Sequence, residues 1–276
     1  MQLSPKKIKQ FQKKILSWYG EHKRSLPWRA VPDGTPLQER AYMTLVSEVM
    51  SQQTQINRVV PKYESWIKTF PTIKSLEKAK VSEVLHYWSG LGYNRRALNL
   101  KKTAEIISRK LGGKFPNEEK ELLQLPGIGR YTARAILCFA FDQQVAVVDT
   151  NVRKIIVTQF GIDGNEKELE SIATQLLPKG KAYDWNQALM DYAASVLKKE
   201  KIVIPKQSKF IGSRRYYRGQ ILKYLLKNKK ISFADLGNII KQDYTTSEKE
   251  WLEKLLQELV DEGFIVKKQG MVVLAS

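Results

Sequence analysis

Hydrophobic residues recur along most of this chain at intervals of three and four positions, the spacing that places them on one face of a helix. In residues 5–20, for example, Ile8, Phe11, Ile15 and Tyr19 share such a face. The alternation of polar and apolar residues that marks strands is nearly absent before residue 200. The pattern predicts an all-α fold for this part, with helices at residues 5–20, 41–56, 57–70, 81–88, 95–111, 118–124, 130–141, from 151 onward, 165–177 and 184–199.

The helical pattern breaks at residues 200–213, where Pro205, Gly212 and several Lys and Ser residues indicate a linker. Three helices closed by a hairpin are typical of a winged-helix domain, although a generic small α+β domain fits the pattern equally well. We therefore expect two domains, residues 1–205 and residues 206–276. In the second domain the pattern predicts helices at residues 214–228, 232–241 and 246–261, short strands at 264–267 and 271–274, and a turn at Gln269-Gly270.

The charge of the chain narrows the class of partner. The 276 residues include 47 Lys and Arg against 28 Asp and Glu, a net charge of +19. Hydrophobic residues make up 42% of the chain, enough for a folded core, so the positive surplus must lie on the surface. A surface of this kind attracts polyanions, with nucleic acid as the first candidate and an anionic membrane surface as the second. Both predicted domains are basic.

Cysteine and histidine are too scarce for several kinds of site. With only Cys138, the sequence excludes a disulfide framework, a four-cysteine zinc site and a cysteine-ligated iron–sulfur cluster. With only His22 and His86, a histidine-based metal site is not expected either, so we expect no cofactor. No apolar run approaches the roughly 20 residues that span a bilayer, and the basic N-terminus is not followed by the apolar core of a secretory signal. We expect an intracellular protein.

Residues 125–132 read Leu-Pro-Gly-Ile-Gly-Arg-Tyr-Thr and separate two predicted helices. Gly127 and Gly129 allow a sharp turn, after which the second helix begins with backbone N–H groups that lack helical partners. Such a helix start binds phosphate through these groups and the helix dipole, without reading the base. Arg130 adds a positive charge at the same place. An ordinary turn is the alternative, but the Leu-Pro prefix and the flanking helices favour a phosphate-binding hairpin.

Two carboxylates are candidates for chemistry. Asp149 ends the apolar run 145–150, the best short extended segment in this part of the chain. A buried Asp there needs partners or a function, but it equally fits the N-cap of the next helix, and both roles are compatible. Glu48 precedes the polar run 51–55, whose side chains cannot all face solvent on a helix with apolar stripes. We expect some of them to face a cleft, although Glu48 alone would more often be a surface residue.

Six ordered segments resemble the helix-hairpin-helix, Gly/Pro-Asp DNA glycosylase superfamily, and within it most closely the MutY group of adenine glycosylases. The resemblance covers roughly residues 5–197. It implies two helical subdomains with a base pocket in the cleft between them. The matching segments are residues 24–29 (Arg-Ser-Leu-Pro-Trp-Arg), 47–55 (Ser-Glu-Val-Met-Ser-Gln-Gln-Thr-Gln), 90–93 (Gly-Leu-Gly-Tyr), 125–132, 148–152 (Val-Asp-Thr-Asn-Val) and 186–191 (Asn-Gln-Ala-Leu-Met-Asp).

The resemblance assigns three catalytic residues. Asp149 would stabilise the oxocarbenium-like sugar cation, and Glu48 would be the general acid that protonates the departing purine. Two carboxylates in different protonation states suit this chemistry, because the base must leave neutral while the sugar's charge is balanced. Tyr131 matches a position where tyrosine assists the carboxylates. Bifunctional relatives have there a lysine that forms a Schiff base, so we expect a monofunctional glycosylase.

The resemblance also implies binding residues. It places Arg24, Leu26, Trp28 and Asp191 in the base pocket, which a nucleotide reaches only by flipping out of the stack. Gln53 matches a residue that probes the duplex beside the lesion, and Tyr93 lies in the segment that wedges bases apart. The basic and aromatic segment 212–219 is expected to contact phosphate. The complete set of expected DNA-binding residues is Gln52, Gln53, Tyr93, Gly127, Gly129, Arg130, Thr132, Asn151, Arg214 and Arg215.

The sequence departs from this group in three places. Residues 198–203, where the group usually has its four-cysteine iron–sulfur loop, contain no cysteine. Only about 70 residues follow, in place of the usual domain that recognises 8-oxoguanine. Asn94 stands where a second aromatic often follows Tyr93. We expect the protein to bind, as a monomer, double-stranded DNA containing a mispaired or damaged base.

Three functions fit these observations. The first is release of adenine mispaired with guanine or 8-oxoguanine, favoured by Glu48 and the run 52–54 (Gln-Gln-Thr). The second is a thymine, uracil or hypoxanthine glycosylase on the same scaffold, which Tyr131 does not exclude. The third is a non-catalytic DNA-binding protein, which the presence of both carboxylates disfavours.

Overall fold

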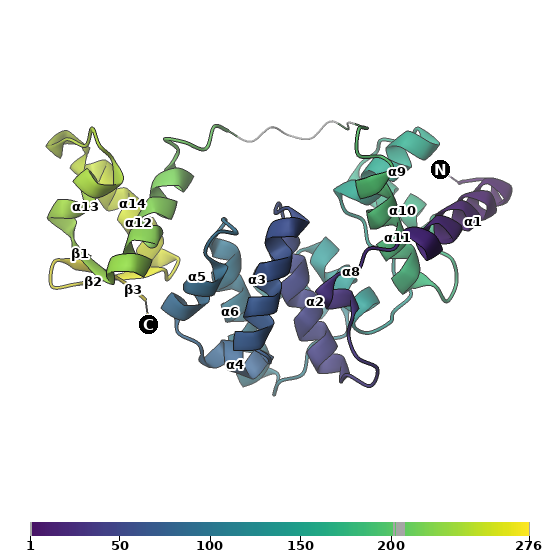
Figure 1. Ribbon diagram of the computed structural model, residues 1–276, viewed down its shortest axis with the longest axis horizontal. Helices are drawn as coiled ribbons and strands as arrows, with labels where there is room; N and C mark the ends of the chain where they lie inside the picture. The colour runs from purple at the N-terminus through teal and green to yellow at the C-terminus, as the bar shows by residue number, and fades with distance from the viewer. Residues whose placement is uncertain (1, 201, 203–207, 276) are drawn as a thin grey trace. The chain divides into compact units, whose positions relative to one another are not determined.

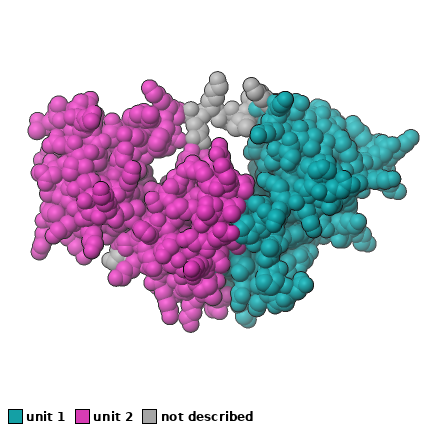
Figure 2. All heavy atoms as spheres, in the orientation of Figure 1, with its two compact units in different colours: residues 1–49, 114–205 teal, residues 50–113, 206–276 magenta. Residues whose placement is uncertain are grey.

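The computed structural model describes residues 2–200, 202 and 208–275. The chain forms two compact units, each built from two segments (Figure 2). Unit 1 comprises Met1–Val49 and Lys114–Pro205, and unit 2 comprises Met50–Gly113 and Lys206–Ser276. The middle of the predicted linker, including the expected boundary between residues 205 and 206, lies outside the described residues, so the two-domain division of the sequence stays a prediction.

Unit 1 is built around a helical core. Within it α11 packs against α1 and α9, and the ring of Phe11 packs edge-on against Phe160 and Trp185, with centroids 5.0 and 5.8 Å away. Figure 1 shows these helices grouped together. The elements of unit 1 are α1 (Pro5–His22), η1 (Pro27–Arg29), α2 (Leu37–Ser51, whose last two residues belong to unit 2), α7 (Glu119–Leu122), α8 (Arg130–Phe139), α9 (Thr150–Phe160), α10 (Glu166–Leu176) and α11 (Ala182–Ser195).

The first segment of unit 2 adds four helices, with α6 packed against both α4 and α5. Its core contains Trp66 and Trp88, which are fully buried and pack edge-on with ring centroids 5.6 Å apart. Lys101 is also buried, and its ammonium group donates to the Glu77 carbonyl at 3.0 Å. The four helices are α3 (Ile56–Thr69), α4 (Ile73–Lys78), α5 (Val81–Trp88) and α6 (Arg95–Lys110).

The C-terminal segment combines helices with a three-stranded antiparallel sheet of order β1-β3-β2. Two of its strands are the predicted hairpin, turning at Gln269 and Gly270. The first strand was not predicted, because three residues are too few to show alternation. The winged-helix assignment stays a prediction. The elements are α12 (Arg214–Asn228), β1 (Lys230–Ser232), α13 (Phe233–Ile240), η2 (Thr246–Glu248), α14 (Lys249–Asp261), β2 (Ile265–Lys268) and β3 (Met271–Leu274).

The expected fold class, mainly α with a small α+β segment at the C-terminus, is confirmed. Near Glu48, one predicted helix boundary differs from the structure. Helix α2 covers Leu37–Ser51 rather than residues 41–56, because a turn at residues 52–55 separates it from α3. The apolar run 145–150 is extended as expected but pairs with no strand among the described residues.

Candidate active site

Glu48 and Tyr131 form a buried pair. Glu48 lies on α2 among the buried residues Tyr42, Leu45 and Val49, and only 9% of it is exposed. Tyr131 lies in the first turn of α8, within the predicted hairpin segment 125–132. Its hydroxyl donates a hydrogen bond of 2.6 Å to Oε2 of Glu48. The structure thus brings together two residues that are 83 positions apart in the sequence.

Burial controls the protonation of this pair. Desolvation raises the pKa of Glu48 from 4.5 to about 7; the hydrogen bond from Tyr131 opposes the rise, whereas the charge of Asp149 adds to it. The positive charge of Arg29 also lowers the pKa of Glu48, as the hydrogen bond does. Burial holds the pKa of Tyr131 well above its ordinary value, so its hydroxyl keeps its proton near neutral pH. Glu48 is therefore a carboxyl group that can give up a proton near pH 7.

Asp149 is the N-cap of α9, as the sequence allowed. Its Oδ1 accepts a hydrogen bond of 2.8 Å from the Val152 N–H, and its Oδ2 accepts one of 2.7 Å from Nδ2 of Asn151. Burial raises the pKa of Asp149, while these hydrogen bonds favour the charged form and act against the rise. Asn151 thus orients this carboxylate, and its expected contact with DNA stays a prediction.

Asn186 fixes the extended segment that leads to Asp149. Its side-chain oxygen accepts from the Val147 N–H at 2.9 Å, and its Nδ2 donates to the carbonyls of Val145 and Ala182 at 3.0 and 2.9 Å. Asn186 therefore does for this segment what a neighbouring strand does in a sheet: it satisfies buried backbone groups. This contact explains why an apolar run without a sheet partner remains extended.

Asp191 organises two arginines of the 24–29 segment. Its carboxylate is fully buried and accepts from the Arg24 backbone N–H at 3.0 Å, from Nε of Arg24 at 2.7 Å, and from both terminal nitrogens of Arg29 at 2.7 and 2.9 Å. Burial alone would raise the pKa of Asp191, but the hydrogen bonds from Arg29 and Arg24 hold it below its ordinary value. Asp191 is therefore a charged anchor that is already saturated by protein donors.

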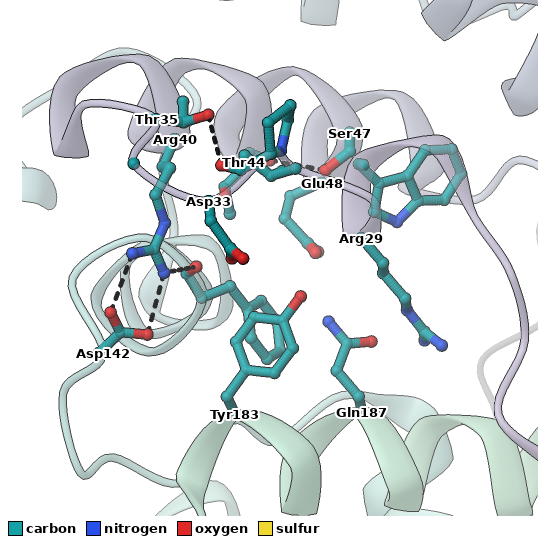
Figure 3. A pocket seen from close by; sticks show the side chains of 15 residues that line it. Arg29, Asp33, Thr35, Arg40, Thr44, Ser47, Glu48, Asp142, Tyr183 and Gln187 are labelled. Atoms are coloured by element: carbon teal, nitrogen blue, oxygen red, sulfur yellow. Dashed lines mark hydrogen bonds and ion pairs between the residues drawn. The ribbon is translucent and has the colours of Figure 1, made fainter.

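A cavity of about 400 Å³ opens beside Glu48, within the size range of small-molecule sites. Figure 3 shows Glu48, Asp33, Tyr183 and Gln187 pointing into it, with the paired side chains of Arg40 and Asp142 at one side. The cavity is lined by Trp28, Arg29, Val31, Pro32, Asp33, Gly34, Thr35, Arg40, Thr44, Ser47, Glu48, Phe139, Asp142, Tyr183 and Gln187.

Of the four residues expected in the base pocket, Trp28 lines this cavity, whereas Arg24, Leu26 and Asp191 are not among its lining residues. The place of all four in the pocket that receives the base stays a prediction. Several other lining residues were not predicted as site residues. The matching segments already contained Arg29 and Gln187, whereas Asp33, Arg40, Asp142 and Tyr183 carried no sequence signal.

The hairpin forms where it was predicted. Gly127 has a φ of 77°, in the left-handed region that favours glycine, and Gly129 is the N-cap of α8. The Arg130 guanidinium lies 3.1 Å from Glu170 and 3.7 Å from Glu119, so intramolecular carboxylates already neutralise part of its charge. Thr132 is buried in the same helix turn. The proposed phosphate contact therefore depends mainly on backbone N–H groups of the hairpin.

In unit 2, Gln53 and Tyr93 have positive φ angles of 53° and 48°. Tyr93 is 43% exposed, and Gln53 is exposed as well while Gln52 is half-buried.

The two arginines of the segment 212–219 that were expected to bind DNA both have partners within the C-terminal segment. Arg214 is ion-paired with Glu258. Arg215 donates to the Ser208 carbonyl at 2.8 Å.

The residues at positions 198–203, where the MutY group usually has its iron–sulfur loop, do not fit such a cluster. Such a cluster needs cysteine thiolates, and the chain has only Cys138. That thiol is buried in α8, and its Sγ accepts a hydrogen bond of 3.3 Å from Nδ2 of Asn186. Burial raises the pKa of the thiol to about 12. Residues 201 and 203 of this segment lie outside the described part of the chain.

Among curated proteins, the adenine DNA glycosylase of Rattus norvegicus is 43% identical over 194 residues. The match covers 67% of this chain but only 38% of the rat protein. The chain thus spans well under two thirds of this relative. Among solved structures, a thermostable thymine-DNA glycosylase is 31% identical with a TM-score of 0.62, covering 69% of this chain and 87% of that one.

An endonuclease III–DNA covalent complex gives a TM-score of 0.58 at 20% identity over 69% of this chain and 86% of that one, which supports the fold alone. A family model described as HhH-GPD superfamily base excision DNA repair protein matches residues 46–179. These residues contain Glu48, Tyr131 and Asp149 together with the hairpin. The chain therefore belongs to the HhH-GPD superfamily of base excision DNA repair proteins.

Proposed function

We propose that this protein is a monofunctional DNA glycosylase that releases adenine mispaired with guanine or 8-oxoguanine. The observation that carries the proposal is the buried Glu48–Tyr131 pair, because it gives a carboxyl group with a pKa of about 7 at the edge of a base-sized cavity. A general acid is most effective when its pKa lies near the working pH. The curated relative named adenine DNA glycosylase supports adenine as the base.

In this mechanism the N-glycosidic bond breaks with its electron pair moving to the purine. Glu48 gives its proton to the purine ring, so that the base leaves neutral rather than as an anion. The sugar is left with a positive charge, which a water molecule then neutralises by attack at the anomeric carbon. Glu48, now ionised, is able to accept a proton from that water, as in related two-carboxylate hydrolyses.

Asp149 serves as the negative charge that stabilises the sugar cation. The N-cap hydrogen bonds from Val152 and Asn151 fix its carboxylate in one orientation. A fixed charge of this kind stabilises a developing cation without the cost of reorganisation. Tyr131 has no amine with which to form a Schiff base, so strand cleavage is not expected to accompany base release.

The proposed partner is double-stranded DNA. The net charge of +19 and the backbone N–H groups of the hairpin suit the phosphate backbone. The target nucleotide must leave the base stack before its base reaches the cavity beside Glu48. We propose that one copy of the protein acts on one lesion, inside the cell. No helix in the described part of the chain is long and apolar enough to cross a membrane.

A panel of labelled duplexes tests the substrate. Each duplex carries one mispair, A·8-oxoguanine, A·G, T·G, U·G or hypoxanthine·T, and base release is detected by alkaline cleavage of the abasic strand. We expect release from the two adenine duplexes, and strand cleavage only after alkali. The absence of release from both adenine duplexes would rule out the proposed substrate.

A thymine or uracil glycosylase is the second candidate, favoured by the solved thymine-DNA glycosylase that is 31% identical over 87% of its length. Release from the T·G or U·G duplex without release of adenine would select it. A non-catalytic DNA-binding protein would release no base from any duplex. Release that persists in both Glu48→Gln and Asp149→Asn proteins would refute the mechanism for every substrate.

A further inference from the structure

The guanidinium group of Arg96 connects two turns that are far apart in the sequence. Arg96 lies in the first turn of α6. Its Nη1 donates to the carbonyls of Met50, at 3.1 Å, and Gln52. Its Nη2 donates to the carbonyls of Leu91 and Gly92, at 3.2 and 3.1 Å, and to Oγ1 of Thr54 at 3.1 Å. All of these residues belong to unit 2.

These acceptors lie at the ends of two helices. Met50 is in the last turn of α2, and residues 91 and 92 follow the end of α5. Carbonyl groups at a helix C-terminus lack the N–H partners of the helix interior, and an arginine is well suited to satisfy them. Arg96 thus joins the end of α2 to the turn that follows α5 with one planar group, whose several donors have a fixed geometry that lysine does not reproduce.

The position of Arg96 is not explained by the stability of its own helix. A positive charge in the first turn of α6 is unfavourable with respect to the helix dipole. The group is held instead by its carbonyl acceptors and by two aromatic rings, Trp88 and Tyr93, whose centroids are 5.1 and 5.6 Å from the guanidinium carbon. The indole of Trp88 also donates to the Gly92 carbonyl at 2.9 Å.

Each connected turn presents one of the residues expected to enter the duplex. Gln53 and Tyr93 both have left-handed backbones, with φ of 53° and 48°. This conformation is uncommon for residues other than glycine and persists only where the surroundings enforce it. Two of the four carbonyls held by Arg96 belong to Gln52 and Gly92, the residues immediately before Gln53 and Tyr93.

We propose that Arg96 is a positioning residue for base flipping: it holds the Gln53 turn and the Tyr93 turn at one fixed spacing, so that both side chains enter the duplex together. The inference rests on the proposed function. A base-flipping enzyme must hold the opened duplex while the nucleotide occupies the pocket, and two probes on separate turns do so only when the turns are joined. Arg96 itself need not touch DNA.

The test measures opening of the duplex separately from base release. In a Glu48→Gln background, a duplex with 2-aminopurine next to the target base reports unstacking by a rise in fluorescence at saturating protein. Arg96→Lys keeps the charge and removes the planar fork. Arg109→Lys is the matched control, because Arg109 lies on the same helix, has a side chain that is 67% exposed, and pairs only with Glu77 in the contacts described.

We expect Arg96→Lys to reduce the fluorescence rise by about fivefold or more, and Arg109→Lys to leave it within about twofold of the parent. In the otherwise unaltered protein, Arg96→Lys should slow base release from a fully paired duplex by about tenfold or more. The loss should shrink to about threefold or less when the nucleotide opposite the target is abasic, because the base is then easier to flip.

The outcomes separate this inference from the proposed function. An unchanged fluorescence rise in Arg96→Lys, or equal losses of rate on the two duplexes, overturns the positioning role, since a general folding defect lowers both rates alike. A Glu48→Gln protein that never raises the fluorescence also overturns it. If the unaltered protein releases no base from any duplex, the proposed function fails, while the fluorescence comparison still decides the role of Arg96.

Discussion

The hydroxyl of Tyr131 donates a 2.6 Å hydrogen bond to Oε2 of Glu48, a carboxyl group whose burial raises its pKa to about 7. The two effects act in opposite directions. Burial favours the neutral acid, and the hydrogen bond favours the carboxylate. As a result, Glu48 is mostly protonated below about pH 7 and can give up its proton near that pH.

Base release should therefore decline as the pH rises through about 7. Glu48 must be protonated to act as general acid, so the rate should fall about tenfold for each pH unit well above its pKa. The pKa of Tyr131 is held well above its ordinary value, so Tyr131 stays protonated in this range and does not contribute to the pH dependence of the rate. Single-turnover rates between pH 5.5 and 9 at constant salt measure the decline. A rate that increases steadily across pH 6 to 8 would contradict the assignment of Glu48.

Replacing Tyr131 with Phe should move this decline to higher pH. The hydrogen bond lowers the pKa of Glu48, so its loss leaves burial less opposed and raises that pKa further. A hydrogen bond to a charged group contributes about 1.5–3 kcal/mol, which corresponds to a shift of roughly one to two pH units. Tyr63→Phe, a buried tyrosine of α3, is the control and should leave the profile in place. A shift to lower pH would show that the hydroxyl acts otherwise.

The sequence predicted the identity of the central residues better than their surroundings. Glu48 and Asp149 were found because each is part of a short local pattern, a polar run on an apolar helix and an apolar run before a helix start. The convergence of Arg24 and Arg29 on Asp191 joins residues more than 160 positions apart, and no local pattern records it.

In the fold, too, local patterns predicted the helices, whereas a feature set by a distant contact was missed. The helical spacing of α1, α5 and α6 was sufficient to predict them, because each buries one apolar face. The end of α2 was placed too late, since residues 52–55 are compatible with a helix by themselves. The Gln52 carbonyl and the Thr54 hydroxyl instead accept hydrogen bonds from Arg96, more than 40 positions away in the sequence.

Glu48→Gln should stabilise the protein at alkaline pH. The pKa of this carboxyl rises from 4.5 to about 7 on folding, so the folded state favours the protonated form. Its contribution to stability is complete below about pH 4.5 and is lost as the pH rises to 7. The neutral amide avoids this loss, which amounts to about 3 kcal/mol at pH 8.

Thermal melting at pH 8 and pH 4.5 measures this effect. The Gln variant should melt several degrees higher than the parent at pH 8 and at nearly the same temperature at pH 4.5. Glu121→Gln, on the exposed side of α7, provides a control with the same change of charge. A variant that is less stable than the parent at pH 8 would mean that the ionised carboxylate is favoured by the fold.

Asp191→Asn should destabilise unit 1 and slow base release together. The carboxylate is fully buried and receives hydrogen bonds from both Arg24 and Arg29. Removing one partner of a buried ion pair typically costs about 3–5 kcal/mol, because the remaining charge is left uncompensated. Urea unfolding measures the loss, and Asp163→Asn, at an exposed pair with Arg153, is the control. A loss below about 1 kcal/mol would show that Asp191 is not the anchor of the two arginines.

Asp149→Asn should separate the two roles of Asp149. Asn and Asp are about equally good N-caps, so the amide oxygen can still accept the hydrogen bond from the Val152 N–H. The negative charge that stabilises the sugar cation is lost. We expect base release to fall by about 100-fold or more while the melting temperature changes little.

Asp149→Ala provides the comparison that makes this test decisive. It removes the charge and the cap together, so it should lose a similar amount of activity and, in addition, about 0.5–2 kcal/mol of stability. If the two variants are equally destabilised, the cap hydrogen bond does not survive in the amide, and the loss of activity is then a structural effect. If Asn retains full activity, the residue serves only as a helix cap, because a neutral amide supplies no charge to balance the sugar cation.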